Sequence, residues 1–256
     1  MGTKLTIVCS LAALALPAPA YAVVGGQSVQ SGRYSFAVAV GDAKGADCGG
    51  TLIAPSVVLT AAHCVDADAG DPAKLRVVVG SATINSAPTV LVSAVYVHPL
   101  FRADTMHYDA ALLILEHPVT GVRTIEMAES SPLAGATVSA AGWGETTEHA
   151  ATLPDHLRSV VLKVATKRAC GHGNSKIPGG YFTPSMMCAG NPGRDTCSGD
   201  SGGPLVGTSH GHTVLVGITS FGIGCARTGH PGVYTRVPSI RGCALGQIAR
   251  SLPAAQ

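Results

Sequence analysis

The sequence has little charge and few aromatic side chains. Charged residues make up 12% of the 256 positions, the formal net charge is +2, and aromatic residues account for only 4%. A chain this close to neutral has no excess of basic residues with which to bind nucleic acid. Its hydrophobic content of 46% is far above that of disordered chains. The composition therefore predicts a globular protein with no nucleic-acid partner.

Long hydrophobic runs are also missing, because no segment reaches the roughly 20 apolar residues that span a bilayer. The apolar run LTIVCSLAALAL, residues 5–16, follows Lys4 and precedes Pro17, Pro19 and several small residues. A short apolar run between a basic residue and a small-residue cleavage site is typical of a secretory signal peptide. We therefore predict that residues 1–22 are a signal peptide, that the protein is secreted into the extracellular medium, and that it has no membrane anchor.

Cysteines are few but sufficient for a small set of disulfides. Cys9 lies within the expected leader and would leave with it, and seven cysteines remain. Cysteines of exported proteins are mostly paired, so an odd number predicts that at least one is left over. The seven are Cys48, Cys64, Cys170, Cys188, Cys197, Cys225 and Cys243.

Short apolar and β-branched segments, separated by clusters of Gly, Pro, Asp and Ser, fill the rest of the chain. Their spacing favours antiparallel barrels or sandwiches, so the expected fold class is all-β, either one large domain or two barrels. An internal boundary is expected at residues 116–135, and a helix is expected after Pro238, although Gly242 and Gly246 weaken it. The expected strands cover residues 35–40, 57–60, 75–80, 89–97, 111–115, 136–142, 160–165 and 213–221.

The stretch DTCSGDSGGP, residues 195–204, holds the most distinctive chemistry. Glycines around Ser201 let backbone approach its hydroxyl, and nearby N–H groups are then free to bind an oxyanion. A plain glycine-rich turn is the structural alternative. GDSGG also matches the G-x-S-x-G elbow of the α/β-hydrolases, but that fold places its acid after the serine. Since no Asp or Glu follows Asp200, an acid that assists Ser201 must lie upstream.

Two upstream residues complete a catalytic set. His63 in TAAHC follows an apolar strand, although a lone histidine beside a cysteine is more often structural. Asp109 in HYDAALLIL lies at the mouth of a buried strand, where an unpaired carboxylate is costly. Spacing alone does not choose Asp109 over Asp104 or Asp66. A histidine, an acid and a glycine-flanked serine supply a base, its orienting anion and a nucleophile.

At this point the sequence resembles the chymotrypsin-like (trypsin-fold) serine proteases, and among them most closely the trypsins. The resemblance implies two six-stranded antiparallel β-barrels with the active site in the cleft between them and a short C-terminal helix. It implies a protease domain at 23–256, with the N-terminal barrel at about 23–120 and the C-terminal barrel at about 130–240. The matching segments follow the family's order from residue 23 to about 237: VVGG, TAAHC, DAALL, AGWG, DTCSGDSGGPL, SFGIGCA and PGVYTRV.

The implied activity is that of a serine endopeptidase working through an acyl-enzyme. His63 would act as the base, Asp109 would orient its ring, and Ser201 would be the nucleophile. The backbone N–H groups of Gly199 and Ser201 would form the oxyanion hole.

The implied specificity is that of the trypsins. Asp195 stands six residues before the serine, at the base of the family's primary pocket, where a carboxylate selects Arg or Lys. Gly222 and Gly232 match the pocket walls, and Ser220, Phe221 and Gly222 would line the strand that pairs with substrate. The alternative is that Asp195 is a solvated loop carboxylate. The sequence departs from the family where Phe221 replaces the usual tryptophan and where a threonine replaces the serine common after the pocket aspartate.

The resemblance also implies the disulfides Cys48–Cys64, Cys170–Cys188 and Cys197–Cys225. Cys243 then remains unpaired, for which burial is expected and an intermolecular bridge is the alternative.

No cofactor and no metal are expected. Residues 81–89 lack the carboxylates of the family's calcium loop, and His210 and His212 alone are a weak case for a metal site. The expected partners are protein or peptide substrates with Arg or Lys at the cleavage site, together with protein protease inhibitors, and the protein is expected to be a monomer.

The resemblance further implies that a free amino group at Val23 pairs with Asp200. Ala20-Tyr21-Ala22 is a signal-peptidase site, so we expect export to expose Val23 directly, with a rival cut after Ala20 that leaves a Tyr21-Ala22 dipeptide. Two other functions are weighed against the protease: a catalytically silent, trypsin-like binding protein, and an esterase on another fold.

Overall fold

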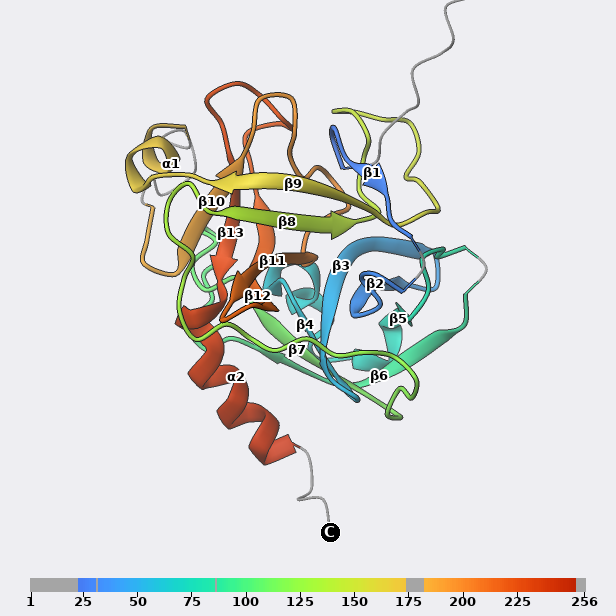
Figure 1. Ribbon diagram of the computed structural model, residues 1–256. Coiled ribbons are helices and arrows are strands. Elements are labelled where there is room, and N and C mark those ends of the chain that lie inside the picture. The colour runs from blue at the N-terminus through green and yellow to red at the C-terminus, as the bar shows by residue number, and fades with distance from the viewer. Residues whose placement is uncertain (1–22, 31, 86, 174–181, 252–256) are drawn as a thin grey trace, which may run out of the picture.

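Two closed antiparallel β-barrels make up most of the chain (Figure 1). The computed structural model describes residues 23–30, 32–85, 87–173 and 182–251. The expected signal peptide and both expected cleavage sites precede Val23 and lie outside the described residues. The predicted two-barrel fold with a short C-terminal helix is confirmed.

The first barrel closes in the strand order β2-β3-β4-β7-β6-β5. Every residue of β4 and β7 is buried, as expected for continuous apolar strands, and the two strands pair from Val57↔Ile114 to Thr60↔Ala111. Its strands are β2 (Ala37–Asp42), β3 (Gly45–Ala54), β4 (Val57–Thr60), β5 (Arg76–Val79), β6 (Thr89–Val97) and β7 (Ala111–Leu115).

The second barrel follows the order β8-β9-β10-β13-β12-β11 and closes through pairing of β9 with β8. A short strand, β1 (Gln27–Ser28), joins the edge of β9. The start of the described chain is therefore attached to the second barrel before the first barrel begins. The strands of the second barrel are β8 (Thr137–Gly142), β9 (Arg158–Val164), β10 (Met186–Gly190), β11 (Pro204–Ser209), β12 (His212–Phe221) and β13 (Gly232–Arg236).

Helices are short except at the C-terminal end. The helix expected after Pro238 is present as α2 (Val237–Ser251), because burial of Val237, Ile240 and Ala244 outweighs the cost of its two glycines. None of the helices in the described ranges has the length and apolar character needed to cross a membrane. The remaining helices are η1 (Ala62–Cys64), η2 (Asp66–Asp68), η3 (Pro72–Lys74) and α1 (Lys167–Gly173).

All eight segments expected from the sequence form strands, but that set was incomplete. It lacked β1, β3, β10, β11 and β13, of which β3 is GADCGGTLIA. Its glycines make the sequence of β3 resemble a loop. The barrel nevertheless requires glycine at position 50, because a Cβ at Gly50 would lie 2.7 Å from the Cγ1 of Val58.

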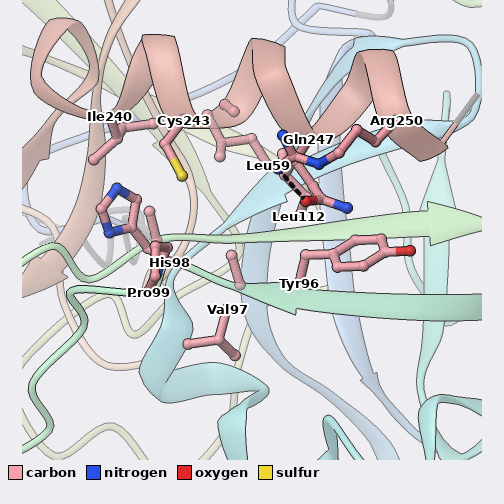
Figure 2. A pocket seen from close by; sticks show the side chains of 13 residues that line it. Leu59, Tyr96, Val97, His98, Pro99, Leu112, Ile240, Cys243, Gln247 and Arg250 are labelled. Atoms are coloured by element: carbon pink, nitrogen blue, oxygen red, sulfur yellow. Dashed lines mark hydrogen bonds between the residues drawn. The ribbon is translucent and has the colours of Figure 1, made fainter.

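The three disulfides pair as the resemblance implied. Cys243 is unpaired but half-buried rather than buried. Its side chain lines a largely apolar cavity of about 270 Å³ between α2 and the strands β6 and β7, beside Ile240 and Leu112 (Figure 2). The thiol is therefore a wall of a surface cavity and not part of the close-packed core.

Leu113 in β7 is fully buried, so Leu113→Ala should lower the free energy of unfolding by about 2–5 kcal/mol through lost burial and a residual cavity. The matched control is Leu133→Ala, because Leu133 is 83% exposed; it should change stability by less than about 0.5 kcal/mol. Urea unfolding of both variants measures the difference. Equal losses would contradict the placement of β7 in the core.

Candidate active site

His63 and Asp109, both from the first barrel, are in direct contact. His63 lies on η1, directly after β4, and Asp109 lies just before β7, the partner strand of β4. The Asp109 carboxylate accepts the His63 Nδ1–H at 2.8 Å through Oδ2 and the His63 backbone N–H at 2.9 Å through Oδ1. The two bonds fix the tautomer and the orientation of the ring.

Asp109 is also held by the second barrel. Ser220 on β12 donates its hydroxyl to Asp109 Oδ2 at 2.5 Å, and Thr235 on β13 donates to the Asp109 backbone oxygen at 2.8 Å. The other two candidate acids lie elsewhere: Asp104 is exposed beside Arg102, and Asp66 is exposed on η2. The structure therefore makes the choice among the three acids that spacing left open.

The pKa of His63 is raised above its ordinary value of 6.5. Burial has the largest single effect on this pKa, but it favours the neutral ring and therefore lowers the pKa. The hydrogen bond and charge of Asp109, with the charge of Asp66, favour the protonated ring and together outweigh it. The imidazole is thus a stronger base than a free histidine.

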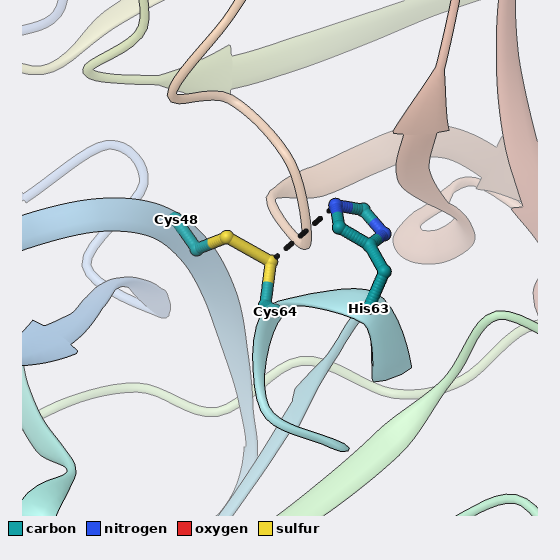
Figure 3. Close-up of side chains that lie close together, drawn as sticks. All are labelled: Cys48, His63 and Cys64. Carbon is teal, nitrogen blue, oxygen red and sulfur yellow. Dashed lines mark hydrogen bonds between the residues drawn. A yellow bond between two sulfur atoms is a disulfide. The ribbon is translucent and has the colours of Figure 1, made fainter. Parts of the chain in front are cut away.

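Ser201 lies in the turn that follows β10 and precedes β11. In this state its hydroxyl makes no hydrogen bond to His63 within the described part of the chain; the His63 Nε2 instead lies 3.7 Å from the Cys64 Sγ (Figure 3). The backbone oxygen of Ser201 lies at the same distance from that sulfur. Ser201 and His63 thus flank one disulfide, and hydrogen bonds between active-site groups are often long without substrate and shorten only when it binds.

The backbone around Ser201 leaves two amide groups unoccupied. Neither the N–H of Gly199 nor that of Ser201 donates to any group in the described residues. Gly199 has φ +88°, which turns its N–H in a direction that other residues rarely allow. At Gly202, a Cβ would lie 2.3 Å from the Gly49 backbone oxygen. Two free donors beside a serine hydroxyl suit a developing oxyanion.

A cavity of about 440 Å³ opens beside Ser201. Every residue expected from the sequence to bind substrate lines it together with the serine: Asp195, Ser220, Phe221, Gly222 and Gly232. Gly232 is required, because a Cβ there would lie 2.6 Å from the Asp195 Oδ1. A side chain at that wall would block access to the carboxylate.

Asp195 lies at the base of this cavity and is 2% exposed. Its Oδ1 accepts the Thr196 N–H at 2.9 Å, and its Oδ2 accepts the Ala226 N–H at 3.2 Å. Burial raises the pKa of this carboxyl to about 7, against the effect of these amides. Asp195 is therefore not a solvated loop carboxylate.

Asp200 is a second fully buried carboxylate. It accepts the Gly144 N–H at 2.8 Å and the Cys197 N–H at 2.9 Å, and burial raises its pKa to about 7. No cation pairs with it in the described ranges. Val23 is fully buried in the core of the same barrel. The backbone oxygen of Val24, the next residue, accepts the Asp195 N–H at 3.1 Å.

Three features of the site had no role in the sequence analysis. The Ser220 hydroxyl binds Asp109, Gly144 leaves room for Asp200, and Glu148 lines the cavity. The motif AGWG contains Gly144 and was a usable signal for it. Glu148 carried no local signal, because its partner Arg227 is 79 positions away.

The described residues offer no clear metal site. The two groups of three possible ligands, Cys48-His63-Cys64 and Glu145-Cys197-Cys225, both contain disulfide sulfurs, which are not thiolates. His210 and His212 are both exposed.

Comparisons with known proteins agree with this geometry. The family model described as Trypsin matches residues 23–243. A trypsin of Saccharopolyspora erythraea is 40% identical over 224 residues, covering 84% of this chain and 93% of the relative. Hypodermin-B of Hypoderma lineatum is 38% identical, covering 84% and 78%, and a vitellin-degrading protease of Bombyx mori is 38% identical, covering 86% and 83%. The chain therefore belongs to the trypsin family of serine proteases.

Proposed function

We propose that this protein is a secreted serine endopeptidase that cleaves peptide bonds after Arg or Lys. One observation carries the specificity: Asp195 is buried at the base of the cavity beside Ser201, behind glycine walls. A carboxylate in such a pocket binds a guanidinium or ammonium and rejects a neutral side chain, which leaves the charge without a partner. The relative from Saccharopolyspora erythraea, named trypsin, supports the same specificity.

The chemical steps follow from the arrangement of the groups. Ser201 Oγ attacks the scissile carbonyl while His63 Nε2 takes its proton, and His63 then gives that proton to the leaving amine. The acyl-enzyme is hydrolysed by water through the same two transfers. Asp109 keeps the Nδ1 proton in place and stabilises the imidazolium. The free N–H groups of Gly199 and Ser201 bind the oxyanion, and loss of one such donor typically costs about 100- to 1,000-fold in rate.

Activation is proposed to depend on Val23. A signal-peptidase cut after Ala22 would free its amino group, and a protonated amine would supply the cation that Asp200 does not find among the described residues. The mature protease domain would then comprise residues 23–256 and act as a monomer on protein or peptide substrates. Protein protease inhibitors that present Arg or Lys would bind the same cleft.

The substrate preference is tested with Asp195→Ser. The variant should lose about 10³- to 10⁵-fold in kcat/KM on Arg and Lys p-nitroanilides, because its pocket has no charge for the substrate cation. Asp104→Ser is the matched control, since Asp104 is an exposed carboxylate outside the cavity. Both variants should still react with a sulfonyl fluoride at Ser201. An intact wild-type chain that stays unlabelled would instead support a binding protein, and one that cleaves only simple acyl esters would support an esterase.

The role of Asp109 is tested through the pH dependence of kcat/KM, which reports the pKa values of the free enzyme. Catalysis needs neutral His63, so the raised pKa predicts that kcat/KM falls to half on the acid side above pH 6.5. Asp109→Asn removes the charge and the hydrogen bond that raise this pKa. It should therefore move the acid limb to lower pH and reduce kcat by about 10⁴-fold. An unchanged acid limb would show that Asp109 does not control the imidazole.

The activation proposal is tested by N-terminal sequencing of the secreted, active protein. Its first residue should be Val23, and active protein that begins at Tyr21 would refute direct activation. Activity should also decline at alkaline pH, because an α-amino group of pKa about 8, raised by a neighbouring carboxylate, loses its proton there. Full activity well above about pH 10 would contradict the ion pair with Asp200.

A further inference from the structure

An ion pair spans the rim of the substrate cavity. The Arg227 guanidinium binds the Glu148 carboxylate through two bonds, Nε to Oε2 at 3.0 Å and Nη2 to Oε1 at 2.6 Å. Such paired geometry is more specific than a single contact. Glu148 itself lines the cavity with Asp195 and Ser201. The pair therefore joins two loops that sequence separates, and it does so at the entrance to the pocket.

Arg227 is connected to Asp195, at the base of the pocket, through the neighbouring residue Ala226. Arg227 folds back over Gly224, another lining residue, so closely that a Cβ there would lie 2.2 Å from the Arg227 Nε. The preceding residue, Ala226, donates its N–H to Asp195 and has φ +55°, a conformation that non-glycine residues hold only when their surroundings impose it. Arg227 directly follows Ala226 in the chain, so an interaction that fixes the Arg227 side chain also restrains the Ala226 backbone.

The loop that carries Glu148 also contacts the turn formed by Ser198 and Gly199. The loop that carries Glu148 begins at Glu145, whose N–H donates to the Ser198 backbone oxygen at 2.7 Å. Farther along, the methyl groups of Leu153 pack over Gly199, at 3.2 Å and 3.3 Å from the position that a Cβ would occupy. One ion pair therefore connects the loop that covers Gly199 with the loop that supports Asp195.

We propose that Glu148 and Arg227 are positioning residues that hold the primary specificity pocket in its binding conformation. They act through Ala226 on Asp195 and touch no reacting atom. The inference rests on the proposed Arg or Lys specificity and deepens it. The side chain of Arg227 is 53% exposed and that of Glu148 is 25% exposed, so dissolved salt screens their attraction. Substrate binding in the pocket should therefore weaken as the ionic strength rises. The hydrogen bonds from Arg227 also lower the pKa of Glu148, so the pair stays ionised through neutral pH.

The test compares Glu148→Gln, Arg227→Gln and the double variant with the wild type. The matched control is Glu129→Gln, which breaks the 3.0 Å pair of Glu129 with Arg241; neither of these residues lines the cavity. The readouts are kcat and KM on an Arg p-nitroanilide and the inhibition constant of benzamidine, from low to high sodium chloride. Each single variant should raise KM and the inhibition constant about three- to fivefold, with kcat nearly constant.

Two further results distinguish positioning from a general loss of stability. The double variant should be no weaker than either single variant, because both remove one interaction. The exchange Glu148→Arg with Arg227→Glu should recover much of the loss, and the single variants should lose the salt dependence of the wild type. An active wild type with Glu148→Gln equal to Glu129→Gln would overturn this inference alone. A wild type that cleaves neither Arg nor Lys substrates would overturn the proposed function and this inference with it.

Discussion

The site depends on three buried carboxylates, Asp109, Asp195 and Asp200, each at most 2% exposed. A buried anion is costly unless a cation or several hydrogen bonds accompany it. Asp109 has its partner in His63. Asp195 and Asp200 are held by backbone N–H groups alone among the described contacts, and both have a pKa raised to about 7. On our account the substrate side chain supplies the cation for Asp195, and Val23 supplies the cation for Asp200.

This constraint explains why the site needs both barrels. Asp109 comes from the first barrel, but hydroxyls on β12 and β13 of the second barrel bind it. Gly49 of the first barrel donates its N–H to the Ser201 backbone oxygen at 2.6 Å, which places Ser201 against β3. Relative movement of the barrels would break these bonds together, so the catalytic geometry and the interface between the barrels stabilise each other.

The sequence predicted what local chemistry determines. Continuous apolar runs identified strands such as β7, and the glycine-flanked Ser201 identified the site. It did not reveal β3, whose glycines resemble a loop until Val58 packs against Gly50. Spacing along the chain left Asp109, Asp104 and Asp66 equivalent, and only the family resemblance favoured Asp109, because it is the pairing of β4 with β7 that brings this acid to His63. Contacts between side chains distant in sequence, such as Ser220 with Asp109, arise from the folded barrels and have no local pattern.

The most direct test of the three-carboxylate account measures protons released when a cation enters the pocket. Benzamidine binding to the mature enzyme is followed by calorimetry near pH 7 in buffers of different ionisation enthalpy. An empty-pocket pKa of about 7 for Asp195 predicts release of about half a proton at that pH, because the bound cation favours the ionised carboxylate. Proton release on binding should vanish well above pH 7, and it should vanish at any pH in the variant Asp195→Asn. Tight binding without proton release between about pH 6 and pH 7 would contradict the account.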